Sequence, residues 1–119
     1  MHGHQDLEVW QKAMDLVISI YRLTAIFPKS EVYGLASQMR RAAVSVPSNI
    51  AEGHGLKQTQ AYLRHLAIAN GSLAELETQL EIANRLGYIA KGSDQIMEQA
   101  HEVGRMLTGL RKSLQSRLP

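Results

Sequence analysis

Hydrophobic side chains recur every three or four residues along most of this chain, which is the spacing of an amphipathic α-helix. The clearest seam lies between about Thr59 and Leu86 and consists of Tyr62, Leu66, Ala69, Leu73, Leu76, Leu80 and Ala83. A second seam follows Ser93, a natural N-cap, and consists of Ile96, Ala100, Val103, Leu107, Leu110 and Leu114. We expect these two helices to pack against each other in antiparallel fashion.

The first predicted helix, from about Leu7 to Thr24, is apolar over a wider arc than a helix of an isolated bundle needs. One stripe includes Trp10, Val17 and Tyr21. A second stripe beside it consists of Leu16, Ile20, Leu23 and Phe27. Because a lone bundle would leave part of this surface wet, we predict that the second stripe is an interface with another copy of the chain.

The second predicted helix, from about Gly34 to Glu52, has one apolar face and a polar stripe beside it. The apolar face consists of Leu35, Met39, Ala42, Val46 and Ile50, and the stripe of Gln38, Arg41, Ser45, Ser48 and Glu52. Pro47 lies inside this segment and removes a backbone donor, so we expect a kink there, or a helix that ends and restarts near Ser45. Gly53 is then expected to be the left-handed cap of this helix.

Clusters of turn-forming residues separate the four segments: Phe27 to Ser30, Gly53 to Gly55, and Gly87 to Gly92. The 119 residues are enough for one domain, which we place at 1–119. Four helices of similar length joined by short connections predict an all-α fold, an antiparallel up-down-up-down four-helix bundle.

Composition indicates the class of protein and its localisation but does not indicate its function. Apolar residues make up 45% and charged residues 20%, as in globular proteins, and the formal net charge is only +2. The absence of Cys excludes disulfides, thiolate metal sites and a cysteine nucleophile. We expect no signal peptide, because the first residues lack its basic and apolar blocks. We expect no membrane span, because charges interrupt every apolar stretch, and we expect a cytoplasmic protein.

Glu98 and His101 have the spacing of a carboxylate-bridged metal site on one helical face. Such a site needs a second Glu-x-x-His and further inward glutamates, which the chain lacks. We therefore expect Glu98 and His101 to face away from the core as a solvated pair. His2 and His4 are at most an adventitious chelating pair, and we predict no metal and no cofactor.

Other candidate chemistry is equally weak. Gly53-His54-Gly55 follows no strand and precedes no Lys-Ser/Thr, so it is a turn rather than a phosphate loop. Gly71-Ser72 lacks the context of a nucleophile elbow, and the glycine is expected to let a neighbouring backbone come close. Glu77 and Glu81 are expected to be i,i+4 partners on a solvated face, with Arg85 next. We predict no catalytic residue and no small-molecule substrate.

Two segments of the chain carry cations without acids. Only Arg40 and Arg41 are charged between Val32 and Ala51, and no acid follows Val103. Cations at a helix C-terminus also suit the helix dipole, and Arg41 is also explained as a structural residue. The functional interpretation is phosphate binding. The candidate RNA-binding residues are Arg40, Arg105, Arg111, Lys112 and Arg117, with little base stacking expected because aromatic residues are few.

Three runs of the sequence carry a family resemblance: DLEVWQKA at 6–13, QMRRAAVSVPSNIAEG at 38–53 and ANGSLAELETQL at 69–80. From about residue 6 to residue 114 the chain resembles the four-helix bundle proteins encoded in intervening sequences of bacterial 23S rRNA genes. That family is similar to the accessory variability protein of diversity-generating retroelements, a ring-shaped homopentamer that binds nucleic acid and a reverse transcriptase. The resemblance implies a homopentamer and no enzymatic activity.

The resemblance gives the polar stripe of the second helix an architectural role. Arg41 and Glu52 lie three turns apart, roughly 16 Å along the axis, which is too far to pair within one helix. We expect each to be buried against another helix or another subunit, because a lone desolvated charge is costly. Arg41, Ser45, Asn49 and Glu52 are therefore interpreted as structural or interface residues rather than as an active site.

Three function classes stay open, in this order. The first is a non-enzymatic oligomeric adaptor that binds structured RNA or a nucleoprotein through basic surface patches, which requires the cations to share one exposed face. The second is a structural or protein-interaction ring without nucleic-acid binding, which dispersed cations and an uncovered apolar face would favour. The third is a small metallo-enzyme, which requires inward-facing Glu and His.

Overall fold

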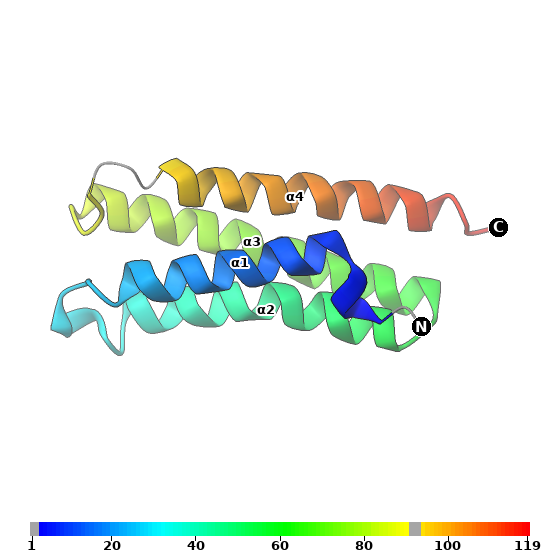
Figure 1. Cartoon of the computed structure of the whole chain (residues 1–119), viewed down its shortest axis with the longest axis horizontal. Helices are drawn as coiled ribbons and strands as arrows, with labels where there is room; N and C mark the ends of the chain where they lie inside the picture. Colours follow the sequence, from blue (N-terminus) through cyan, green and yellow to red (C-terminus); the bar gives the residue numbers. More distant parts are fainter. Residues whose placement is uncertain (1–2, 91–93) are drawn as a thin grey trace.

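The computed structural model describes residues 3–90 and 94–119, and four α-helices account for most of them (Figure 1). These are α1 (Glu8–Thr24), α2 (Leu35–Gly55), α3 (Thr59–Arg85) and α4 (Asp94–Gln115). Two short 3₁₀ turns, η1 (His4–Asp6) and η2 (Lys29–Glu31), precede α1 and α2. The described part of the chain contains no strand, so the predicted all-α class is confirmed. The predicted N-cap Ser93 and His2 lie outside the described residues.

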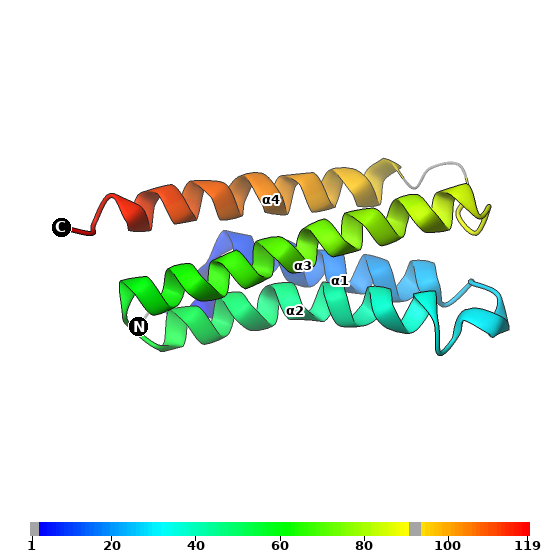
Figure 2. The same cartoon turned by 180° about the vertical axis from the view of Figure 1, so that it is seen from behind.

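The four helices lie side by side in a body of 49 × 22 × 22 Å. Figure 1 shows α1 running from right to left, α2 returning, and α3 and α4 repeating this course. Both α1 and α3 pack against α2 and α4, whereas the backbones of α1 and α3 do not approach each other closely. Seen from behind, α3 lies along α2 for much of its length (Figure 2). None of the described helices is long and apolar enough to cross a membrane.

The two seams predicted for α3 and α4 face the core. All seven α3 seam residues are buried, and so are Ala100, Val103, Leu107 and Leu114 of α4. Ile96 and Leu110 pack against the same core from partly buried positions. The periodicity of these segments therefore identified the correct faces.

The second stripe of α1 corrects the sequence analysis. Leu16 and Ile20 are fully buried, Phe27 is 8% exposed, and Leu23 packs against the core from a half-buried position. They belong to the chain's own interior, so the prediction that this stripe is left uncovered for another copy is wrong. The physical reason is that α1 packs on α2 and on α4, and two neighbours need a wider apolar arc than one.

Of the two alternatives expected around Pro47, the structure excludes one. α2 continues without a break from Leu35 to Gly55, so the helix does not end and restart near Ser45. Pro47 is buried, and tertiary packing overrides its local tendency to break the helix. The other alternative, a kink at Pro47, stays a prediction.

Two glycines also have roles different from those predicted. Gly53 is helical rather than a left-handed cap, and the positive φ after α2 belongs to Lys57, at 54°. A Cβ on Gly53 would lie 2.8 Å from Cδ1 of Tyr62 and 2.9 Å from Cβ of His65, so this glycine lets α2 and α3 come close. A Cβ on Gly71 would meet no described atom within 4 Å, so the expected close approach is not there.

Candidate functional site

A chain of polar side chains lies between α2 and α3. Ser45 Oγ and Ser72 Oγ share a hydrogen bond of 2.8 Å, and Asn49 Nδ2 donates to the Ser45 carbonyl oxygen at 2.9 Å and to Ser45 Oγ at 3.1 Å. Asn49 Oδ1 lies 2.9 Å from His65 Nδ1, and the same ring nitrogen lies 3.6 Å from a carboxylate oxygen of Glu52. The amide nitrogen of Asn49 thus bonds within α2, and its amide oxygen reaches across to His65 of α3.

This arrangement does not form an activated nucleophile. A serine nucleophile needs a base within hydrogen-bond reach of its hydroxyl. Here the amide of Asn49 stands between Ser45 and His65, and the hydroxyl of Ser45 meets Ser72 instead. The geometry suits helix registration, in line with the architectural role predicted for Ser45 and Asn49.

Arg41 and Glu52 were expected to be buried, but both are exposed. The Arg41 residue is exposed and has no hydrogen bond or ion pair with any described residue. The Glu52 side chain is 69% exposed, although it reaches His65. The expected burial against another helix of the same chain is therefore wrong, because both residues lie on the outer side of α2, and burial against another subunit stays a prediction.

Arg40, which we predicted to bind RNA, is instead held against α1. Its Nε donates to Thr24 Oγ1 at 2.8 Å, and its Nη2 donates to the Tyr21 carbonyl oxygen at 3.3 Å. Its guanidinium also lies 4.6 Å from the centre of the Tyr21 ring. Its neighbour Arg41 is free of such contacts. The two arginines therefore have surroundings opposite to those expected, although no observation tests their functional roles.

The other candidate RNA-binding residues differ in solvent exposure and in whether they already have a partner within the chain. Arg105 donates through Nη2 to Glu98 Oε1 at 2.9 Å, and Arg111 is partly buried, with its Nε shielded from solvent. Lys112 and Arg117 are exposed.

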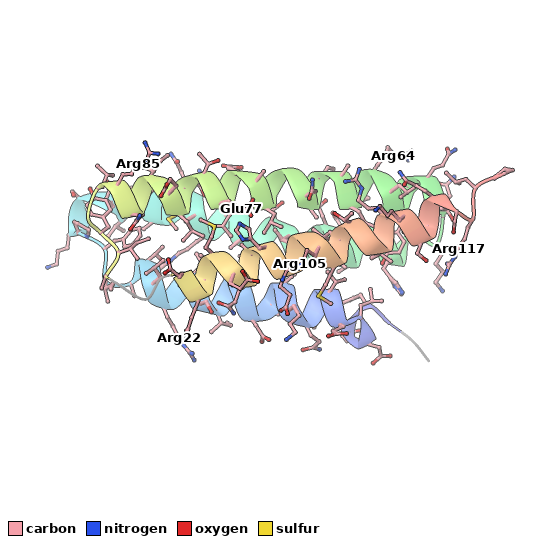
Figure 3. The ribbon with its side chains drawn as sticks, turned by 90° about the horizontal axis from the view of Figure 1, so that it is seen from above. Arg22, Arg64, Glu77, Arg85, Arg105 and Arg117 are labelled. Atoms are coloured by element: carbon pink, nitrogen blue, oxygen red, sulfur yellow. The ribbon has the colours of Figure 1, made fainter. Side chains whose placement is uncertain are left out.

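The five candidates do not share one surface. Arg40 contacts the end of α1 at one end of the bundle, whereas Arg117 lies at the opposite end, close to the end of the molecule that carries Arg64 of α3 (Figure 3). Arg105 lies between these ends on α4 (Figure 3). Nothing in the sequence singled out Arg64, because it lies far from Arg117 along the chain. The antiparallel course of α3 and α4 places both arginines toward the same end of the bundle (Figure 3).

An open groove between α1 and the start of α2 combines exposed aromatic and cationic side chains. This α1–α2 groove has a volume of about 620 Å³ and is lined by Tyr21, Val32, Tyr33, Ser37, Arg40, Arg41, Val44 and Ser45. Tyr33 is 97% exposed, and Val32 and Val44 are exposed as well. No acidic residue of the described chain lines it.

The apolar surface continues beyond the α1–α2 groove. Val44 also lines a neighbouring apolar pocket of about 320 Å³, whose other walls include Trp10, Met14 and Pro47. Sequence analysis missed this surface, since Val32 and Tyr33 fall in a turn where periodicity gives no orientation. The one available signal was Val44, an apolar residue on the polar side of α2 three positions after Arg41.

Glu98 and His101 face away from the core, as predicted, and both are exposed. His101 Nε2 lies 3.2 Å from Glu77 Oε1, which links α4 to α3. Within residues 3–90 and 94–119, no three His, Asp or Glu side chains are placed to hold a metal ion together.

Glu31 joins three parts of the chain at one end of the bundle. Its Oε1 accepts a hydrogen bond from the Leu35 amide at 3.1 Å, and its Oε2 accepts one from the Tyr88 hydroxyl at 2.8 Å. These bonds lower the pKa of Glu31, and the same carboxylate raises the pKa of Tyr88. Burial raises the pKa of Tyr62, which packs against Gly53.

Comparisons with known proteins agree on the fold. The sequence model of a family described as 23S rRNA-intervening sequence protein matches residues 5–109. A crystal structure of a protein with unknown function from the S23 ribosomal protein family of Bacteroides thetaiotaomicron VPI-5482 superposes with a TM-score of 0.79. It is 22% identical, and the match covers 87% of this chain and 95% of that chain. No curated protein matches the sequence.

Proposed function

Since the chain belongs to the 23S rRNA-intervening sequence protein family, we propose that it is a non-enzymatic, oligomeric adaptor that engages other proteins through the α1–α2 groove. The observation that carries this proposal is the exposure of apolar and aromatic groups there, with Tyr33 97% exposed beside Val32 and Val44. Burying a large apolar side chain is worth roughly 1.5–3 kcal/mol, and tyrosine and arginine are the residues that most often dominate binding energy at protein interfaces. The groove combines both kinds.

In this proposal the main partner is another copy of the same chain. The up-down-up-down bundle would assemble into a homo-oligomeric ring, and a pentamer is the number that the family resemblance implies. The dispersed cations favour a protein-interaction ring over an RNA-binding adaptor, which is the reverse of the order expected from sequence. No catalytic role is proposed, because the polar contacts between α2 and α3 hold no activated nucleophile.

A second candidate function is binding of structured RNA or a nucleoprotein in the cytoplasm. The observation that favours it is that two exposed cations, Arg64 of α3 and Arg117 just after α4, lie at the same end of the bundle (Figure 3). Lys112 is exposed in the last turn of α4. A single copy offers few phosphate contacts. A ring would repeat them, and the logarithm of affinity would fall by about 0.7 to 0.9 per contact for each tenfold rise in salt.

Self-association is tested by sedimentation equilibrium of the purified chain at micromolar concentration. We expect the wild type to be an oligomer and Val44→Glu to dissociate it, because the new carboxylate would lie in the apolar groove. Ile18→Glu is the matched control: it places the same charge at an exposed apolar position of α1 outside the groove. A monomeric wild type, or equal dissociation by both variants, would contradict the proposal.

The RNA candidate is tested separately, by titrating a structured rRNA fragment at two salt concentrations. Lys112→Ala with Arg117→Ala should weaken binding and reduce the salt dependence by about two contacts. Lys29→Ala with Arg85→Ala removes the same charge from other exposed sites and should have a smaller effect. Absence of binding near 50 mM salt would eliminate this candidate and leave the protein adaptor unaffected.

A further inference from the structure

We infer that the α1–α2 groove of one copy docks onto a defined acidic surface of α3 in a second copy, so that the interface joins two different faces. This inference rests on the proposed self-association and names the two surfaces that it uses. The second surface is a shallow groove of about 590 Å³ on α3, called here the α3 acidic face. It is lined by Ala74, Glu77, Thr78, Glu81, Ile82 and Arg85.

The charges of the two surfaces are opposite. The α1–α2 groove carries Arg40 and Arg41 and is lined by no acid of the described chain. The α3 acidic face carries Glu77 and Glu81 against the single cation Arg85, which lies 3.7 Å from Glu81. Opposite potentials favour docking and fix its orientation, whereas like charges brought face to face cost several kcal/mol.

Arg41 is the cation that this docking would engage. Arg40 already donates hydrogen bonds to Thr24 and to the Tyr21 carbonyl oxygen. Arg41 has no partner among the described residues and lies in the wall of the groove. On the other surface, the Glu81 side chain is 52% exposed and that of Glu77 only 31%, and Glu81 keeps a long ion pair of 3.7 Å with Arg85, whereas Glu77 lies 3.2 Å from His101. Arg41 and Glu81 are therefore the charges best placed to meet between copies.

The two surfaces also match in their apolar parts. Tyr33 projects into solvent beside the exposed Val44, while the α3 acidic face presents Ile82, 44% exposed, next to Ala74. Small and branched side chains flanked by carboxylates suit a protruding phenol flanked by arginines. Packing them together covers exposed apolar area on both copies.

Pairing of like surfaces is disfavoured. If two α1–α2 grooves faced each other about a two-fold axis, Arg41 would lie near the Arg41 of the second copy. If two α3 acidic faces met, Glu77 and Glu81 would lie among the same carboxylates. The unlike combination brings the unpaired Arg41 to glutamate, whereas the single cation of the α3 acidic face, Arg85, is already paired with Glu81 of its own copy.

The surfaces lie on different parts of the bundle and leave each other free. The α1–α2 groove and the α3 acidic face share no residue, although α2, which carries Arg41, packs against α3, which carries Glu81. One copy can therefore hold two neighbours at once, one through each surface. Repetition of such a head-to-tail contact closes a ring or continues as a filament, and does not stop at a dimer.

The test is a charge-reversal cycle read by sedimentation of the purified full chain. Arg41→Glu and Glu81→Arg should each weaken self-association at least about tenfold, because each places like charges across the interface. The double variant, which reverses both charges, should return to within about threefold of the wild type. The matched controls are Arg105→Glu and Glu98→Arg on α4, which break an exposed ion pair of 2.9 Å outside both surfaces and should leave assembly unchanged.

The outcomes separate this inference from the proposal on which it depends. A monomeric wild type overturns both. An oligomeric wild type that Arg41→Glu and Glu81→Arg leave intact overturns the docking surfaces alone and frees the groove for a different protein or for RNA. Weakening by both single variants without recovery in the double variant, while circular dichroism shows intact helices, also overturns the pairing.

Discussion

Replacing Gly53 with alanine tests the closeness of α2 and α3 directly. In the interior of an exposed helix, alanine is more stable than glycine by about 0.8–1.0 kcal/mol. At position 53 the new methyl group would lie 2.8 Å from Tyr62 Cδ1, 2.9 Å from His65 Cβ and 3.3 Å from the Tyr62 carbonyl oxygen. None of these atoms is the far end of a flexible side chain, so the helices themselves must move apart.

Gly71 provides the matched comparison, because it is also helical but a methyl group there would meet no described atom within 4 Å. Gly71→Ala should therefore gain about 0.5–1 kcal/mol of unfolding free energy. Gly53→Ala should gain the same propensity but lose about 1–3 kcal/mol to overpacking, and so lie about 1–3 kcal/mol below Gly71→Ala.

The assay is urea unfolding followed by circular dichroism, with both variants at one protein concentration. Equal free energies of unfolding for Gly53→Ala and Gly71→Ala would refute the close approach of α2 and α3 at this glycine. A shift in midpoint without a change in the slope against urea would confirm that stability alone has changed.

Three further predictions concern other contacts between elements. Asn49→Leu should lower the free energy of unfolding by about 1–3 kcal/mol in urea, because it leaves partners of two helices unsatisfied, whereas exposed Asn70→Ala should change it by less than about 0.5 kcal/mol. Because the pKa of Glu31 is lowered from its ordinary value of 4.5, its contribution to the free energy of unfolding is fully present above pH 4.5 and is lost as the pH falls through the lowered pKa. Glu31→Gln should therefore flatten the acid side of a stability–pH profile, and an unchanged profile would contradict this. Arg40→Ala should cost about 1–2 kcal/mol by thermal or urea unfolding and Arg105→Ala less than about 0.5 kcal/mol, while equal losses would contradict the anchoring role of Arg40.

Helix positions and the α3 and α4 core faces were predictable because they depend on local periodicity. Leu66, Leu73 and Leu80 are buried in the structure as their spacing predicts. The stripe of α1 through Leu16 and Ile20 was assigned to the wrong neighbour. Periodicity shows how wide an apolar face is, but not whether a second helix of the same chain or another copy covers it.

The arginines of α2 show a second limit of sequence reasoning. Arg40 and Arg41 are adjacent in sequence but about 100° apart around the helix, so one reaches α1 and the other faces outward. Composition and charge runs treat them as equivalent. Their surroundings differ because Arg40 contacts Thr24, sixteen residues away in sequence, and Tyr21, whereas Arg41 does not.

The α1–α2 groove could not be predicted for a related reason. Its most exposed member, Tyr33, lies in the turn between η2 and α2, where no repeat fixes the direction of a side chain. The groove forms only when this turn comes next to Tyr21 and Val44. Gly53 was likewise assigned to a helix end from its residue type, although its function depends on Tyr62 in the following helix.

We propose that the exposed α1–α2 groove of this bundle serves self-association. This proposal is tested most directly by the mass of the wild-type chain in sedimentation equilibrium at micromolar concentration and moderate salt. We expect a single species at a multiple of 13.2 kDa, and Val44→Glu should reduce its mass toward that of one copy. A wild-type species of 13.2 kDa over the whole concentration range would contradict it.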